Sequence, residues 1–227
     1  MSYDKMPSGY GSRNGQVVSP YNKEIDPLGS STGSAVAVAA NLICVSIGTE
    51  TNGSLMAPAY KNSIVSIKPT FGLVSRYGII PISETQDTAG SMGRNVADCA
   101  ILLDAIVGSD PLDHYTKNAD SNKQKFNESY LKSAKGKKVG ILYFSNFKYD
   151  DEESLILDQA IKTLENEGLV VKKIEIEAHP MKNDESLLYE FKNSLNSYLA
   201  TVSGHTKMKS LKDIIEFNLE NPEKRLK

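Results

Sequence analysis

The sequence contains no tryptophan, only two cysteines and only three histidines among its 227 residues. His114, His179 and His205 never fall at metal-ligand spacing on one expected element, so the sequence predicts no metal site. Cys44 and Cys99 lie far apart in apolar surroundings. This placement favours buried thiols in a reducing compartment over a disulfide.

Strong charge of one sign and long apolar runs are also missing. The formal net charge is -2, so no strong field attracts nucleic acid or an anionic membrane surface. No run approaches the roughly 18 apolar residues of a membrane span. Residues 1–16 are polar and lack the apolar core of a signal peptide. We therefore expect a cytoplasmic chain with neither nucleic acid nor membrane as a partner.

The chemistry of the chain is concentrated between residues 29 and 70. Two loops, 29–34 and 48–54, are rich in small residues and hydroxyls, and they bracket the apolar segment 35–40. Small residues let backbone N–H groups approach a ligand closely, while hydroxyls supply nucleophiles and proton relays.

The apolar patterning predicts an α/β fold. Capping residues and helical spacing predict helices over residues 33–44, 96–107, 151–168, about 184–203 and 208–219. Short β-branched or alternating runs predict strands over residues 43–47, 63–67, 138–144 and 169–176. Residues 48–54 and 87–94 are expected to be loops, and 110–135 a connector. The short links within 138–176 predict a βαβ unit with parallel strands.

Ser54 is the first candidate nucleophile. It closes the tight loop Thr51-Asn52-Gly53-Ser54, which can aim successive N–H groups at one point, as an oxyanion hole requires. The alternative is a surface turn in which the serine caps the next element. Ser30, Ser31 and Ser34 form a second set. One of them can relay a proton to a buried neutral lysine, or the Gly/Ser run simply caps the following helix.

Other assignments are weaker. Gly29-Ser30-Ser31-Thr32-Gly33 fits the nucleophile-elbow pattern with Ser31 as nucleophile and His179 or His205 as base, but no convincing strand precedes it. Cys44 lacks an electropositive neighbour. Lys68, before Pro69, is either a buried lysine or a structural one.

Taken together, six segments strongly resemble the amidase signature family, with a match running from about residue 7 to 109. These segments are 29–40, 48–54, 67–76, 79–81, 87–90 and 92–98. The resemblance implies a mixed β-sheet covered by helices and hydrolysis of small-molecule carboxamides by a Ser–cis-Ser–Lys triad, without metal or cofactor.

The resemblance also implies the role of each site residue. Ser54 is the nucleophile, and Ser30, after a cis Gly29–Ser30 bond, is the relay. The N–H groups of Thr51, Asn52, Gly53 and Ser54 form the oxyanion hole, and Ser31 supports the network.

The chain departs from the family pattern in two ways. Asn52, Ser63, Ser66 and Ser91 replace residues that are usually glycine or proline, and none is a triad member. More importantly, the family's lysine segment lies well before the relay serine, whereas 29 residues precede Ser30 here. Lys5 and Lys23 do not sit in that motif.

The resemblance therefore implies a partial domain over 1–227, with a signature core (1–109), the connector (110–135) and a βαβ unit with further helices (136–227). We expect an amidase with impaired activity. The alternatives are a non-catalytic remnant, or one half of a split amidase completed by another fragment. A third hypothesis is the elbow enzyme built on Ser31. A partial domain should expose apolar faces and sheet edges and be marginally stable.

Overall fold

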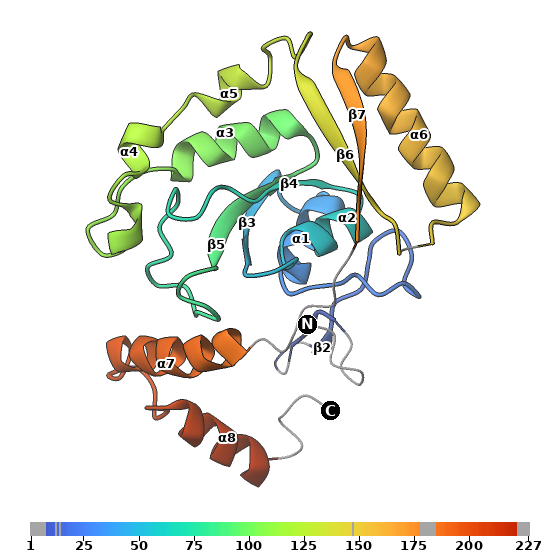
Figure 1. Cartoon of the computed structure of the whole chain (residues 1–227). Coiled ribbons are helices and arrows are strands. Elements are labelled where there is room, and N and C mark those ends of the chain that lie inside the picture. The colour runs from blue at the N-terminus through green and yellow to red at the C-terminus, as the bar shows by residue number, and fades with distance from the viewer. Residues whose placement is uncertain (1–7, 12, 14, 147, 178–184, 222–227) are drawn as a thin grey trace. The chain divides into compact units, whose positions relative to one another are not determined.

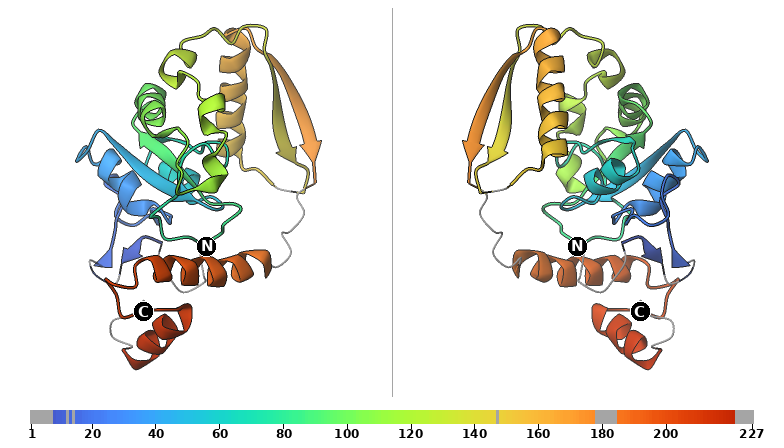
Figure 2. Two further views of the ribbon diagram at one scale, coloured as in Figure 1. Left: turned by 90° about the vertical axis from the view of Figure 1, so that its left-hand side faces the viewer. Right: turned by 90° about the vertical axis from the view of Figure 1, so that its right-hand side faces the viewer.

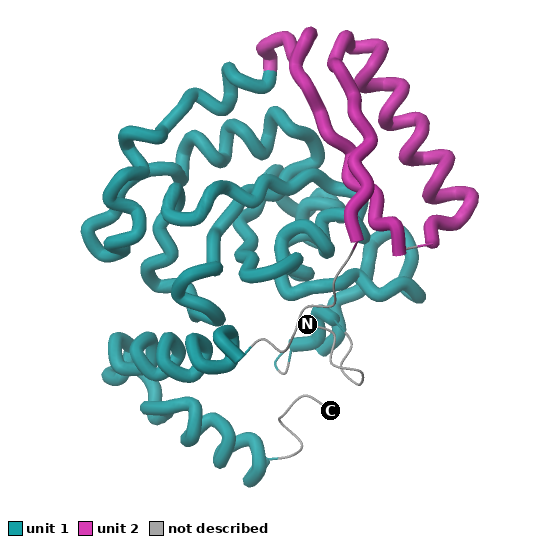
Figure 3. The backbone as a smooth tube through the Cα atoms, in the orientation of Figure 1, with its two compact units in different colours: residues 1–130, 185–227 teal, residues 131–184 magenta. Residues whose placement is uncertain are grey.

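The computed structural model describes residues 8–11, 13, 15–146, 148–177 and 185–221. The chain divides into two compact units, which are coloured separately in Figure 3. The first comprises Met1–Tyr130 together with Glu185–Lys227, and the second comprises Leu131–Asp184.

An antiparallel sheet lies at the centre of the first unit (Figure 1). Its strands are β3 (Val45–Glu50), β5 (Thr88–Gly93) and β4 (Val65–Ile67), in that order across the sheet. Ser91 of β5 is in register with Ile47 on one side and Ile67 on the other.

The central strand corrects the expectation of a loop over residues 87–94. Every residue of β5 is buried, although its sequence Thr-Ala-Gly-Ser-Met-Gly lacks a β-branched run. Its small residues are needed for packing, because a Cβ at Gly90 would lie 2.3 Å from the carbonyl oxygen of Ile67. The loop expected over residues 48–54 is also shorter, since Gly48–Glu50 belongs to β3.

Helices cover both faces of this sheet. Met92 of β5 packs against α1 (Thr32–Ala39) and α2 (Met56–Lys61), whereas Ala89 packs against α3 (Val96–Ile106). Residues three apart on a strand point to opposite faces, so the two clusters lie on opposite sides of the sheet. The predicted helix 33–44 ends early at Ala39, and Val36 and Ala37 on it are half-buried rather than fully enclosed.

The remaining elements of the first unit are mostly short. They are β1 (Tyr10–Gly11), β2 (Gly15–Gln16), a 3-10 turn η1 (His114–Thr116), α4 (Ala119–Asn122), α5 (Phe126–Ser129), α7 (Glu185–Thr201) and α8 (Leu211–Glu220). Helix α3 begins as predicted, with the Asn95 side chain accepting a hydrogen bond from the Asp98 N–H. Helices α7 and α8, both predicted, lie together at one end of the unit in both views of Figure 2.

The second unit is the predicted βαβ motif. Strands β6 (Lys138–Phe144) and β7 (Val170–Ile176) pair in parallel, with α6 (Asp151–Asn166) between them in sequence. A capping box between Asp150 and Glu153 begins α6 at Asp151, the residue at which the sequence predicted its start.

The α/β class is thus confirmed, although the described strands form separate antiparallel and parallel sheets. The expectation for the thiols is half right. Both cysteines are free, but only Cys99 is buried and Cys44 is exposed. Among the described residues, no helix combines the length and apolar character that crossing a membrane requires.

Candidate active site

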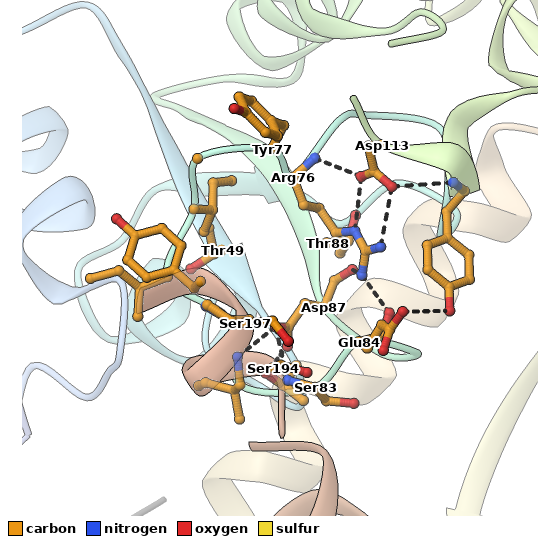
Figure 4. Close-up of a pocket in the computed structure, with 18 of the residues that line it drawn as sticks. Thr49, Arg76, Tyr77, Ser83, Glu84, Asp87, Thr88, Asp113, Ser194 and Ser197 are labelled. Atoms are coloured by element: carbon orange, nitrogen blue, oxygen red, sulfur yellow. Dashed lines mark hydrogen bonds and ion pairs between the residues drawn. The ribbon is translucent and has the colours of Figure 1, made fainter. Parts of the chain in front are cut away.

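A pocket of about 410 Å³ opens in the first unit, and Figure 4 shows many of its lining residues. Ser30, Thr51 and Ser54 lie in its wall, so the two hydroxyl-rich loops meet there. Strand β3, the loop between β4 and β5, the segment 112–115 and helix α7 supply the other lining residues.

The turn that carries Ser54 is held by a buried carboxylate. Glu50, the last residue of β3, accepts hydrogen bonds at Oε2 from the N–H groups of Leu55 (2.8 Å) and Met56 (3.0 Å). These are N-terminal donors of α2 that the helix itself leaves unpaired. Gly53 has a φ of +82°, which closes the turn. Ser54 is only 7% exposed and still lines the pocket.

The loop that carries Ser30 is bonded to the same turn. The Ser31 N–H donates to the Ser54 carbonyl at 3.1 Å. The Gly29–Ser30 peptide bond is cis, as the resemblance implied. Ser30 itself is exposed and faces the pocket.

Ser31 is buried behind the pocket. Its hydroxyl donates to the Thr49 carbonyl at 2.9 Å and accepts from the Thr49 N–H at 3.0 Å. This pairing fixes α1 to β3 and uses the hydroxyl that an elbow nucleophile would need to keep free. Ser34 also joins these elements, because its hydroxyl donates to the Ile47 carbonyl at 2.9 Å.

The other sequence candidates are distributed as follows. Asn52 and Gly53 belong to the turn but do not line the pocket. His205, Lys23, Lys68 and Cys44 do not line it either, while His179 and Lys5 lie outside the described residues. Among the described lining residues there is a histidine, His114, and no lysine.

An ion pair that the sequence did not predict supports the pocket. Arg76 Nε lies 3.2 Å from Asp113 Oδ2, and both side chains are largely buried. Burial raises the pKa of the Asp113 carboxyl, but hydrogen bonds and charge from Arg76 and the Tyr115 N–H outweigh it, leaving that pKa below its usual value. Arg76 fell inside the segment quoted for the family resemblance, whereas Asp113 lay in an expected connector without a motif.

The Glu190 carboxylate bonds helix α7 to the 83–85 segment beside the pocket. Glu190 accepts hydrogen bonds from the Ser83 hydroxyl (2.5 Å) and from the N–H (3.2 Å) and hydroxyl (2.9 Å) of Thr85. The Ser83 bond is the main reason why the pKa of Glu190 is lowered. Sequence spacing could not have found this contact, because more than 100 residues separate the partners.

The pocket offers hydroxyl and backbone chemistry. Among the described residues, no group of histidine, cysteine and carboxylate side chains is arranged to hold a metal ion. Two adjoining loops instead bring two serines to one wall, within an α/β fold whose central strand is nearly all small residues.

Comparison with known proteins agrees with this description. The family model named Amidase matches residues 1–226, so the chain belongs to the amidase family. It is 43% identical over 229 residues to a probable amidase of Arabidopsis thaliana, covering 95% of this chain and 42% of that protein.

Two solved structures are similar over nearly the whole chain. An amidase family protein from Bacillus anthracis superposes with a TM-score of 0.87 at 39% identity, covering 97% of this chain and 44% of that one. The native peptide amidase from Stenotrophomonas maltophilia gives a TM-score of 0.86 at 40% identity, covering 98% and 46%. This chain therefore spans less than half the length of the relatives it matches.

Proposed function

We propose that the chain carries the serine part of an amide-hydrolysing site and acts on small-molecule carboxamides. The observation that supports this most strongly is the meeting of Ser30, Thr51 and Ser54 in one pocket wall. Membership of the amidase family and similarity to a peptide amidase support the choice of a carbon–nitrogen bond.

In this proposal the Ser54 hydroxyl oxygen attacks the amide carbonyl carbon. Its proton passes through the Ser30 hydroxyl to a base and then to the leaving nitrogen as the C–N bond breaks. Water hydrolyses the resulting ester on Ser54. The N–H groups of Thr51, Asn52, Gly53 and Ser54 hold the oxyanion, and Ser31 supports them from behind.

The base in this proposal is the lysine of the family triad. No lysine lies among the described residues of the pocket wall, and Lys5 and Lys23 do not sit in the family's lysine motif, so we propose that the described residues do not supply this base. The chain alone is then expected to be a poor catalyst, because removing one member of such a set costs orders of magnitude in rate.

Labelling with a fluorophosphonate probe tests the assignment of the nucleophile. Labelling of the folded chain should be slow and should disappear in Ser54→Ala. Ser34→Ala is the matched control, because it removes a hydroxyl of the same Gly/Ser segment that bonds the Ile47 carbonyl and does not line the pocket. Loss of labelling in Ser31→Ala with retention in Ser54→Ala would favour the elbow enzyme instead.

A second candidate is one half of a split amidase that a complementing fragment completes. Exposed apolar residues favour it, since Leu42 and Ile47 are 75% and 48% exposed around β3. In the described part of the chain β5 is the one strand that pairs with β3, and side chains rather than a strand lie along its other edge, where Ser31 and Ser34 bond to Thr49 and Ile47. Adding a fragment that bears the family's lysine segment should raise the melting temperature and speed Ser54 labelling. A sharp melt that the fragment leaves unchanged would argue against this candidate.

A further inference from the structure

The pocket wall is strongly acidic. Its described lining includes four carboxylates, on Glu50, Glu84, Asp87 and Asp113, and a single guanidinium, on Arg76. With His114 neutral, the formal charge of the lining is therefore -3. A cleft lined by one sign of charge attracts ligands of the opposite sign and repels ligands of its own.

The guanidinium of Arg76 is largely occupied by bonds within the protein. Its Nε and Nη2 atoms face Asp113 at 3.2 Å and 3.4 Å, and Nη1 donates to the Glu84 carbonyl at 2.6 Å. Figure 4 shows the side chain of Arg76 directed towards these partners. Its carbon Cζ also lies over the rings of Phe71 (4.7 Å) and Tyr115 (4.9 Å). Arg76 thus neutralises Asp113 and has most of its N–H groups bonded within the protein.

The remaining carboxylates differ in how many hydrogen bonds they accept from the protein. Glu50 accepts two backbone N–H bonds, and Asp87 accepts bonds from Thr51, Ile82 and Ser83. Glu84 is exposed, and its carboxylate accepts one bond, at 3.2 Å, from the Tyr115 hydroxyl. Burial and the Glu84 charge raise the pKa of Tyr115, which is consistent with an unneutralised carboxylate beside it.

The other walls of the pocket are uncharged. Residues 79–82 contribute the apolar side chains of Ile79, Ile80, Pro81 and Ile82. Asn193, Ser194 and Ser197 of α7 contribute polar side chains, none of which bonds another described residue. These groups can hold the neutral parts of an amide, and none of them carries a positive charge that would neutralise a carboxylate.

We propose that this pocket selects carboxamides by charge: it accepts those whose remote end is neutral or cationic and rejects those bearing a free carboxylate, with Glu84 as the discriminating residue. The inference rests on the proposed function, since it takes the amide to be the ligand. A carboxylate would enter beside Glu84 without a cation to pair with, and would lose hydration in doing so.

Three ligands of nearly identical shape test this inference: N-butanoyl-, N-succinyl- and N-(β-alanyl)-L-leucinamide. They share the same amide and differ only in a remote methyl, carboxylate or ammonium group. Binding is measured by NMR titration on the Ser54→Ala chain, so that the result does not depend on turnover. The neutral and cationic ligands should bind about tenfold more tightly than the succinyl ligand at low salt. Added salt should reduce this difference in affinity, because it screens the charge of Glu84.

Glu84→Gln tests whether Glu84 is the residue that causes the charge selection, because glutamine keeps an acceptor for the Tyr115 hydroxyl and removes the charge. It should reduce the discrimination about threefold or more, while Glu24→Gln, an exposed change that does not line the pocket, should leave it intact. Succinyl binding as tight as butanoyl binding, or no binding of any ligand, would overturn the inference. If the pocket binds the succinyl ligand more weakly than the other two but Ser54 is never labelled, the proposed function fails and the charge selection stands.

Discussion

The Thr51 hydroxyl donates a 2.5 Å hydrogen bond to Oδ1 of Asp87. The second carboxylate oxygen of Asp87 accepts the N–H groups of Ile82 (2.7 Å) and Ser83 (2.9 Å). One side chain therefore joins the turn that presents Ser54 to the wall that lines the rest of the pocket.

Asp87→Ala should destabilise the first unit by about 3 kcal/mol, because it leaves three donors without their acceptor. Thr51→Val removes one of these bonds with little change of shape, so it should cost about 1 kcal/mol. Urea unfolding of both variants measures the difference. Equal losses in the two variants would mean that the bonds from Ile82 and Ser83 contribute nothing.

Glu190 should control how firmly α7 is held to the 83–85 segment. In Glu190→Ala the hydroxyls of Ser83 and Thr85 lose their acceptor, so hydrogen exchange should rise in both α7 and residues 83–85. Lys192→Ala, an exposed change on the same helix, is the control. Protection that is unchanged in Glu190→Ala would show that other contacts hold the helix.

The Arg76–Asp113 pair should make stability depend on pH in the acid range. Folding lowers the pKa of Asp113 below its usual value of 3.8, so the folded state favours the ionised form. The pair's contribution is full above that value and is lost as the pH falls through the folded pKa.

Asp113→Asn should therefore lower the free energy of unfolding by about 3 kcal/mol near neutral pH. The difference in stability between variant and parent should become smaller below about pH 4. Chemical unfolding measured across this range tests the prediction, with Glu24→Gln as an exposed control. A gap that stays constant with pH would show that the charge of Asp113 does not stabilise the fold.

The two thiols should react at very different rates. Burial is the main cause that raises the pKa of Cys99 from 9.0 to about 11, whereas Cys44 is exposed. The smaller thiolate fraction alone should slow alkylation of Cys99 about a hundredfold relative to an unperturbed thiol. Iodoacetamide followed by peptide mapping should find Cys44 modified first, and Cys44→Ser should remove the fast phase. Rapid modification of folded Cys99 would contradict the buried position.

Local signals explain where prediction succeeded. Helix α3 was predicted from its helical spacing and the cap at Asn95, and α6 from its amphipathic spacing. The βαβ unit was predicted because strand, helix and strand segments follow one another with short links. The strand β5 was missed because its residues are chosen for close packing between two helix layers, as the near contact at Gly90 shows. A run of small residues looks the same in a loop and in a tightly packed strand.

The residues of the pocket also divide into those that local motifs predicted and those that only distant contacts bring to the site. Ser30, Ser31 and the turn 51–54 were named from the sequence, because each lies in a compact motif whose residue types carry their chemistry. Glu190 could not be named, because its partners are more than 100 residues away.

The sequence by itself determined the family, the α/β class and the segments that bear the serines, because residue type and local spacing carry that information. The tertiary structure decided which hydroxyls face the pocket and which are bonded within the protein. It also decided that the Asp87 side chain bonds to two separate loops and that the charge of Arg76 is neutralised by Asp113. These relations depend on pairing between distant segments, and burial gives such pairs their strength by removing water that would otherwise satisfy the same groups.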